Sequence, residues 1–155
     1  MSLYILALLI GVVAGLRAMT APAAVSWAAY LGWIDLDGSW LAFLGHWIAP
    51  WVLSLLALAE LVTDQLPSTP SRKVPVQFGT RVFVGAVCGA ALCFASGAWI
   101  GGLVAGAIGA VIGTLGGYEG RRRLVAATGG WDLPIALLED AMAIVAAIWI
   151  VSYVT

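Results

Sequence analysis

Two pairs of acidic residues lie within apolar stretches of this chain, where an ionised carboxylate is energetically unfavourable unless it has a binding partner. Glu60 and Asp64 are four residues apart in "LAELVTDQ", so on a helix they share one face. Glu139 and Asp140 follow the apolar stretch "LPIALL". Carboxylates in such surroundings bind a cation, exchange protons or pair with a basic side chain. These four residues are the candidate substrate-binding or ion-binding groups.

Two arginines at the ends of apolar runs can balance these charges. Arg17 closes the first run, and Arg81 lies near the start of the fourth. We expect both to join the acids, either as counter-charges of a binding site or as partners in a structural ion-pair network. Glu60, Glu139 and Asp140 also offer hard oxygen ligands, so a divalent cation such as Mg, Ca or Mn is the candidate metal and cofactor.

The composition indicates an integral membrane protein. The 155 residues are 63% hydrophobic and 10% charged, with a mean hydropathy of +1.04. A crossing helix needs about 20 mainly apolar residues, so the length predicts one all-α domain, residues 1–155, with roughly five or six transmembrane helices in a compact bundle. The net charge is −1, and no basic aromatic surface is visible. The lipid bilayer is therefore the expected partner, and nucleic acid is not.

Apolar runs and helix breakers divide the chain into six expected segments. These cover residues 3–20, 21–34, 40–63, 79–97, 99–120 and 133–154. The second is short for a full crossing and is expected to be tilted or re-entrant. Trp47 and Pro50 have the same spacing as Trp131 and Pro134. This weak internal similarity is compatible with two inverted repeats of three helices each.

Basic residues gather on one side of the expected segments. That side carries Arg17, Arg72, Lys73, Arg81, Arg121, Arg122 and Arg123. The loop "DLDGS" on the opposite side carries Asp35 and Asp37 instead. By the positive-inside rule the basic side is cytoplasmic, so both termini are expected outside.

The fifth segment carries a stripe of small residues. Its members are Gly102, Gly106, Gly109, Gly113 and Gly117. Spacings of three and four residues place them on one face, where they let helix backbones touch. Packing inside one protomer is favoured over a homo-oligomer contact or a pore lining, and both alternatives stay open.

Several motifs spread along the chain form a recognisable set. They are Gly15-Leu16-Arg17, Pro22, "AELVTDQLPSTPSR", "GGYEGRRR" and "LPIALLED". Together they resemble a family of small bacterial membrane proteins catalogued as domain of unknown function 4126. The resemblance extends over nearly the whole chain and implies a multi-pass protein of the bacterial inner (plasma) membrane. It implies no activity.

The leading functional hypothesis is a small transporter or permease for a cation or a proton-coupled solute. Its cytoplasm-facing intramembrane site would consist of the four acids, balanced by Arg17 and Arg81. One alternative is a membrane enzyme acting on a phosphorylated lipid head group, with a divalent metal on the acids and phosphate on basic residues that include Arg72 and Lys73. No nucleophile or base constellation accompanies the acids, so no catalytic residue is assigned. Another alternative is a structural or assembly subunit.

Overall fold

The computed structural model describes residues 3–36, 39–63, 75–129 and 132–153, and the regular elements in this part of the chain are all helices. This confirms the predicted all-α class. The six α-helices of this part are α1 (Leu3–Leu16), α2 (Thr20–Tyr30), α3 (Ala49–Thr63), α4 (Pro75–Cys93), α5 (Trp99–Ala127) and α6 (Asp132–Ser152). Two short 3-10 helices, η1 (Ala42–Gly45) and η2 (Phe94–Ser96), lie in the connections.

The break between α1 and α2 lies at a different place from the expected boundary between the first two segments. The first segment was expected to continue to residue 20, but α1 ends at Leu16 and α2 begins at Thr20. Pro22 therefore lies in the first turn of α2, where its missing N–H has no intrahelical acceptor to lose. As predicted, the second helix is short, with 11 residues. The break of three residues before Thr20 leaves backbone groups that need partners from elsewhere in the fold.

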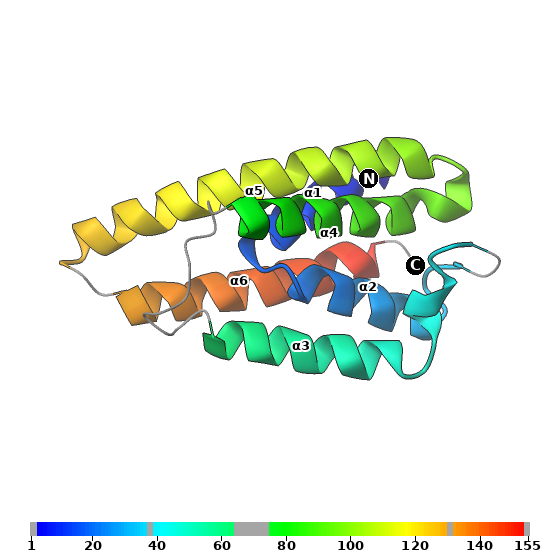
Figure 1. The fold of residues 1–155 in the computed structure, drawn as a ribbon, viewed down its shortest axis with the longest axis horizontal. Coiled ribbons are helices and arrows are strands. Elements are labelled where there is room, and N and C mark those ends of the chain that lie inside the picture. The colour runs from blue at the N-terminus through cyan, green and yellow to red at the C-terminus, as the bar shows by residue number, and fades with distance from the viewer. Residues whose placement is uncertain (1–2, 37–38, 64–74, 130–131, 154–155) are drawn as a thin grey trace.

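Three other helices also begin or end at a different residue from the expected segments. Helix α3 begins at Ala49 instead of residue 40, because turns and η1 occupy the start of that segment. Helix α4 begins at Pro75, and proline is well suited to the first helical position. Helix α5 continues to Ala127, beyond the expected end at residue 120. Its last turns therefore project past the neighbouring helices (Figure 1).

The helices form an elongated bundle in which chain neighbours run in opposite directions (Figure 1). Helices α1 and α2 form a hairpin whose turn lies near the end of α3 and the start of α4. Helices α1, α4 and α5 pack most closely together, and α2 contacts α3, α6 and α4. The N- and C-terminal ends of the chain lie at the same end of the bundle, opposite the projecting end of α5.

Glycines bring α1, α4 and α5 into backbone contact. A Cβ atom added to Gly106 of α5 would lie 2.1 Å from the Gly85 carbonyl oxygen of α4. One added to Gly109 would lie 2.0 Å from the Leu8 carbonyl oxygen of α1. No side chain fits at such distances, so the glycine stripe packs within one chain, as the favoured interpretation predicted. A homo-oligomer stays a prediction, and it would have to use another face of α5.

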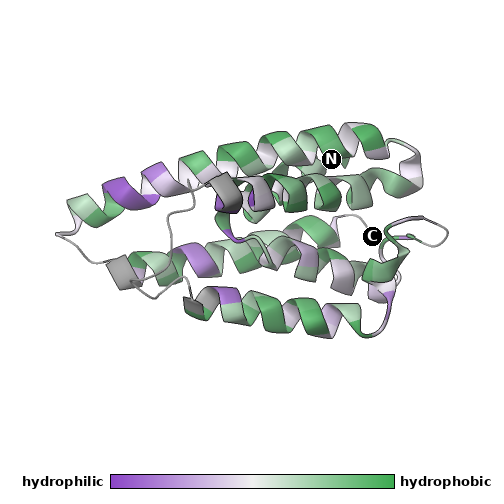
Figure 2. Ribbon diagram, viewed as in Figure 1, coloured by the Kyte–Doolittle hydropathy of each residue, from purple (hydrophilic) through white to green (hydrophobic). Residues whose placement is uncertain are grey.

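Large apolar side chains point outward from this glycine-rich interior. Along α5 the exposed ones recur every three or four residues: Ile100, Val104, Ile108, Ile112 and Leu115. Hydrophobic residues make up most of the length of the helices, as their green colour shows (Figure 2). Among the described helices, two are long and apolar enough to cross a membrane: α5 and residues Pro134–Ser152 of α6.

Candidate functional site at the α1–α2 turn

The candidate site is built on the break between α1 and α2. Residues Arg17, Ala18 and Met19 form the turn, and the Arg17 side chain is fully buried within the bundle. A helix that ends here leaves its last carbonyl groups without N–H donors in the helix, and one that begins here leaves its first N–H groups without carbonyl acceptors. Both sets of backbone groups find charged side chains from other helices.

Glu60 of α3 binds the N-terminal end of α2. Its Oε1 accepts a hydrogen bond from the Ala18 N–H at 2.8 Å, and its Oε2 accepts one from the Met19 N–H at 2.7 Å. The carboxylate thus acts as a helix cap supplied from a different helix. Its negative charge also lies at the positive end of the α2 dipole, which stabilises both.

Arg81 of α4 binds the C-terminal end of α1 in the complementary way. This arginine is 3% exposed, and its Nη1 donates to the Gly15 carbonyl oxygen at 3.0 Å. The Thr114 hydroxyl of α5 donates to the same oxygen at 3.4 Å. A cation at a helix C-terminus is favourable for the dipole. Arg81 Nη2 also lies 3.5 Å from Glu60 Oε1, so the groups that cap the two helix ends pair with each other.

Arg17 extends from the turn toward α6. Its guanidinium donates through Nε to Asp140 Oδ1 and forms an ion pair with the same oxygen through Nη2. Its Nη1 lies 3.8 Å from Glu139 Oε1 and donates to the Leu16 carbonyl oxygen at 3.1 Å. Glu139 Oε2 is in turn 4.0 Å from Arg121 Nη1 of α5. One buried arginine therefore connects the turn to α6 and, through Glu139, to α5.

We call this group of six side chains the turn cluster: Arg17, Glu60, Arg81, Arg121, Glu139 and Asp140. It contains three arginines and three carboxylates, so its formal charge sums to zero when all six are ionised. Buried ions are tolerated only when they are paired and hydrogen-bonded. Here the desolvation cost of each charge is offset by a partner of opposite sign or by backbone groups at a helix end.

Five of the six predicted site residues lie in the turn cluster: Arg17, Glu60, Arg81, Glu139 and Asp140. Asp64 lies outside the described residues, as do Arg72 and Lys73.

The metal site predicted on Glu60, Glu139 and Asp140 stays a prediction. Among the described residues, no three His, Cys, Asp or Glu side chains are grouped closely enough to hold a metal ion. Glu60 instead faces two backbone N–H groups and Arg81, while Asp140 faces Arg17. The carboxylates are satisfied by different donors, so in the described region they do not converge on a common cation.

Sequence reasoning missed several members of the site. Arg121 was interpreted only as an orientation signal, because the fifth segment was expected to end before it. Since α5 continues, Arg121 turns toward Glu139, while Arg122 and Arg123 pair with Glu119 on the helix surface. The Ala18 and Met19 N–H groups also belong to the site, but backbone donors have no signature in a sequence.

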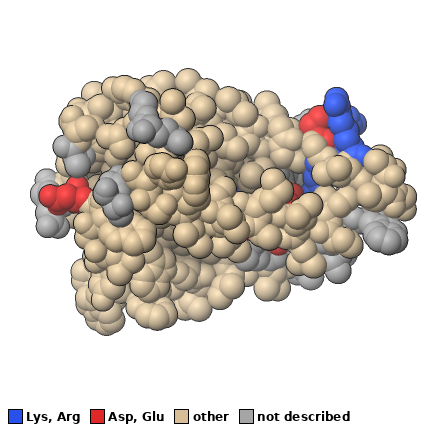
Figure 3. Space-filling view, turned by 180° about the vertical axis from the view of Figure 1, so that it is seen from behind, with Lys and Arg blue, Asp and Glu red and all other residues tan. Residues whose placement is uncertain are grey.

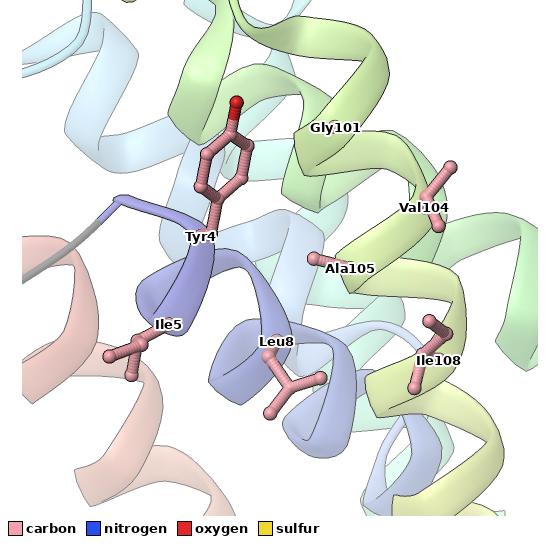
Figure 4. Close-up of a pocket in the computed structure, with 7 residues that line it drawn as sticks. All are labelled: Tyr4, Ile5, Leu8, Gly101, Val104, Ala105 and Ile108. Carbon is pink, nitrogen blue, oxygen red and sulfur yellow. The ribbon is translucent and has the colours of Figure 1, made fainter.

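A separate apolar groove runs between α1 and α5 (Figure 4). It has a volume of about 540 Å³, and its walls include Ile5 and Leu8 of α1 and Val104 and Ile108 of α5. No charged residue is among those that line it. The groove therefore offers contact area to an apolar group and no charged partner.

The fold and the site together define a small all-α protein organised around a buried ion-pair cluster at a helical turn. The chain belongs to the family described as Domain of unknown function (DUF4126), which matches residues 4–153. No curated protein and no solved structure matched the chain.

Proposed function

We propose that the protein is a small multi-pass membrane transporter whose turn cluster couples the movement of a solute to the binding of a proton. The observation that carries the proposal is the fully buried Arg17, held at a helix break by Asp140 and Glu139. Buried ion pairs that connect several helices at a break are typical of membrane segments with a transport task.

A membrane location is supported by the way the bundle distributes its side chains. Glycine and alanine make up much of the interior, beside large aliphatic residues such as Leu6 and Ile10, and many other large apolar side chains are exposed, as on the outer face of α5. A soluble bundle would place its large apolar residues inside. Charged residues lie mostly toward the two ends of the molecule, and much of the face between them carries none (Figure 3). Such a surface suits the hydrocarbon core of a bilayer.

The lengths of the helices support a cluster below the membrane surface. Helix α1 has 14 residues and therefore extends about 21 Å, against about 30 Å for the hydrocarbon core. A hairpin that enters from the side of the N-terminus would turn at Arg17 before it reaches the opposite boundary. The turn cluster would then lie within the bilayer on the side of Arg121, Arg122 and Arg123. By the positive-inside rule this side is cytoplasmic, and both termini are outside.

The charge balance of the turn cluster favours a proton over a metal cation as the coupling ion. Each carboxylate already has an arginine within ion-pair distance, so an added metal cation would find its ligands engaged. Protonation of one of these carboxylates would instead remove the charge that balances its arginine, Asp140 for Arg17 or Glu60 for Arg81. A buried arginine without its counter-charge is unfavourable by several kcal/mol, on the order of the cost of breaking a buried pair. Proton binding would therefore drive the α1–α2 turn to a different position.

The test is proton movement in liposomes that contain the purified protein and a trapped pH-sensitive dye. A panel of external cations, anions and neutral solutes is applied, and the internal pH is followed. We expect at least one solute to drive proton entry, and the variant Asp140→Asn to abolish it while remaining folded. The matched control is Glu119→Gln, because Glu119 forms its ion pairs on the exposed surface of α5.

Two results would count against transport. One is the absence of solute-driven proton movement from every liposome preparation. The other is unchanged movement in Asp140→Asn together with a lower unfolding temperature, which would make the turn cluster a structural brace.

A further inference from the structure

We infer that the N-terminal end of α2 is an anion site, occupied in this structure by the Glu60 carboxylate, and that the transported solute is a small carboxylate anion. The anion would enter when Glu60 takes up a proton and leaves. The inference rests on the proposed function, since it names the solute that the same cluster would carry.

The first observation is the way in which Glu60 is held. The N–H groups of Ala18 and Met19 each bind a different oxygen of the same carboxylate, at 2.8 and 2.7 Å. Arg81 Nη2 lies 3.5 Å from one of these oxygens. Any small carboxylate can present the same two oxygens to the same three donors. Paired N–H groups at a helix N-terminus, with an arginine beside them, form an anion site in general.

A second, independent observation is the hydroxyl of Thr20. Thr20 is the first residue of α2 and is 7% exposed, and its Oγ1 is buried without a hydrogen-bond partner among the described residues. The Cα–Cβ bond of a helical residue leans toward the N-terminus of its helix, so this side chain leans toward the turn that presents the two N–H groups. Buried hydroxyl groups are nearly always hydrogen-bonded. Thr20 therefore provides a donor that Glu60 leaves unused and that a free anion can engage.

The charge balance indicates how the exchange would proceed. A proton binds to a carboxylate oxygen of Glu60, the neutral acid leaves the two N–H groups, and the incoming anion restores the single negative charge there. Arg81 of α4 thus keeps a counter-charge throughout. The other charged groups around the turn also keep their partners: Arg17 with Asp140 and Glu139 of α6, and Arg121 of α5 with Glu139. One proton and one anion move together, and the buried charge does not change.

Thermal unfolding in detergent tests the anion site with formate as the probe. Cys88 and Cys93 are both buried, so a dye that fluoresces on reaction with thiols reports unfolding. The variant Glu60→Ala should lower the unfolding temperature by about 5 °C in chloride, from the loss of two charge-assisted hydrogen bonds. Sodium formate at equal ionic strength should restore at least half of this loss. Formate should have no such effect on the control Glu119→Ala, and an equal response in both variants would overturn the inference.

Thr20→Val examines the second observation, because valine has nearly the same shape and lacks the hydroxyl. Alone it should leave the unfolding temperature unchanged or slightly raised. Combined with Glu60→Ala it should weaken the formate response about tenfold, the effect of one hydrogen bond to a charged group. An unchanged response would remove Thr20 from the site and overturn the inference. If Glu60→Ala does not fold, the wild-type chain should show a formate-dependent rise in unfolding temperature that increases as the pH falls and that Thr20→Val reduces.

Liposomes separate this inference from the proposed function. With a trapped pH-sensitive dye, external pyruvate should drive proton entry, while choline and glycerol should not. Proton entry driven only by a cation or a neutral solute would overturn the inference and leave the transporter in place. Rescue by formate without any solute-driven proton entry would establish the anion site and overturn transport.

Discussion

The Arg17–Asp140 pair allows the sharpest test of the turn cluster. Arg17 is fully buried and Asp140 is 7% exposed, so Arg17→Met leaves a buried carboxylate without its main partner. Breaking such a pair costs about 3 to 5 kcal/mol, which corresponds to a fall of about 6 to 20 °C in unfolding temperature for a chain of this size. Asp140→Leu should cost a similar amount, because it leaves the buried arginine uncompensated.

The double variant Arg17→Met/Asp140→Leu distinguishes a paired charge from a simple packing defect. Two apolar side chains of similar volume remove both desolvation costs, so the double variant should be at least as stable as either single variant and close to the wild type. The assay is thermal unfolding in detergent, followed through the buried thiols. The control is the exposed pair Arg122–Glu119, whose side chains are 64% and 35% exposed and whose removal should cost under about 0.5 kcal/mol. A double variant as unstable as the sum of its singles would refute the pairing.

Three further predictions concern packing, capping and orientation. Gly106→Ala should destabilise the bundle by about 1 to 3 kcal/mol, since its Cβ would lie 2.1 Å from a backbone oxygen. Gly116→Ala should instead stabilise α5 by about 0.5 to 1 kcal/mol, because a Cβ there has nothing within 4 Å. Chemical denaturation in detergent measures both free energies of unfolding. Glu60→Gln should increase hydrogen exchange of the Ala18 and Met19 amides, because an amide side chain cannot accept from two N–H groups through two oxygens; unchanged protection would contradict the capping role. In a chain without its native cysteines, Thr128→Cys should react with impermeant thiol reagents only from the cytoplasmic side and Tyr153→Cys only from outside, and the reverse pattern would invert the proposed topology.

The predictions made from the sequence agree with the structure where helix geometry alone decides which residues come close together. The positions of the acids within apolar runs placed Glu60, Glu139 and Asp140 in one cytoplasm-facing site, although they lie far apart in the sequence. The ends of the apolar runs also indicated the counter-charges, because Arg17 and Arg81 lie there. The predictions failed at the end of α5, where a continued helix carried Arg121 into the turn cluster. Charged residues at the end of an apolar run look the same whether the helix stops or continues.

The sequence by itself determined that the chain is helical, and it predicted a charged site of six side chains, five of which lie in the turn cluster, because periodicity, run length and charge placement are local properties. The tertiary structure alone decided which groups pair. Arg17 pairs with Asp140, while Glu60 accepts hydrogen bonds from two backbone N–H groups and pairs with Arg81. These choices follow from how α1, α4 and α5 approach through their glycines and from where α1 breaks. Neither the order in which helices pack side by side nor a backbone N–H group outside a helix produces a pattern in the sequence. Only the folded chain could therefore show a carboxylate bound as an anion at the end of a helix.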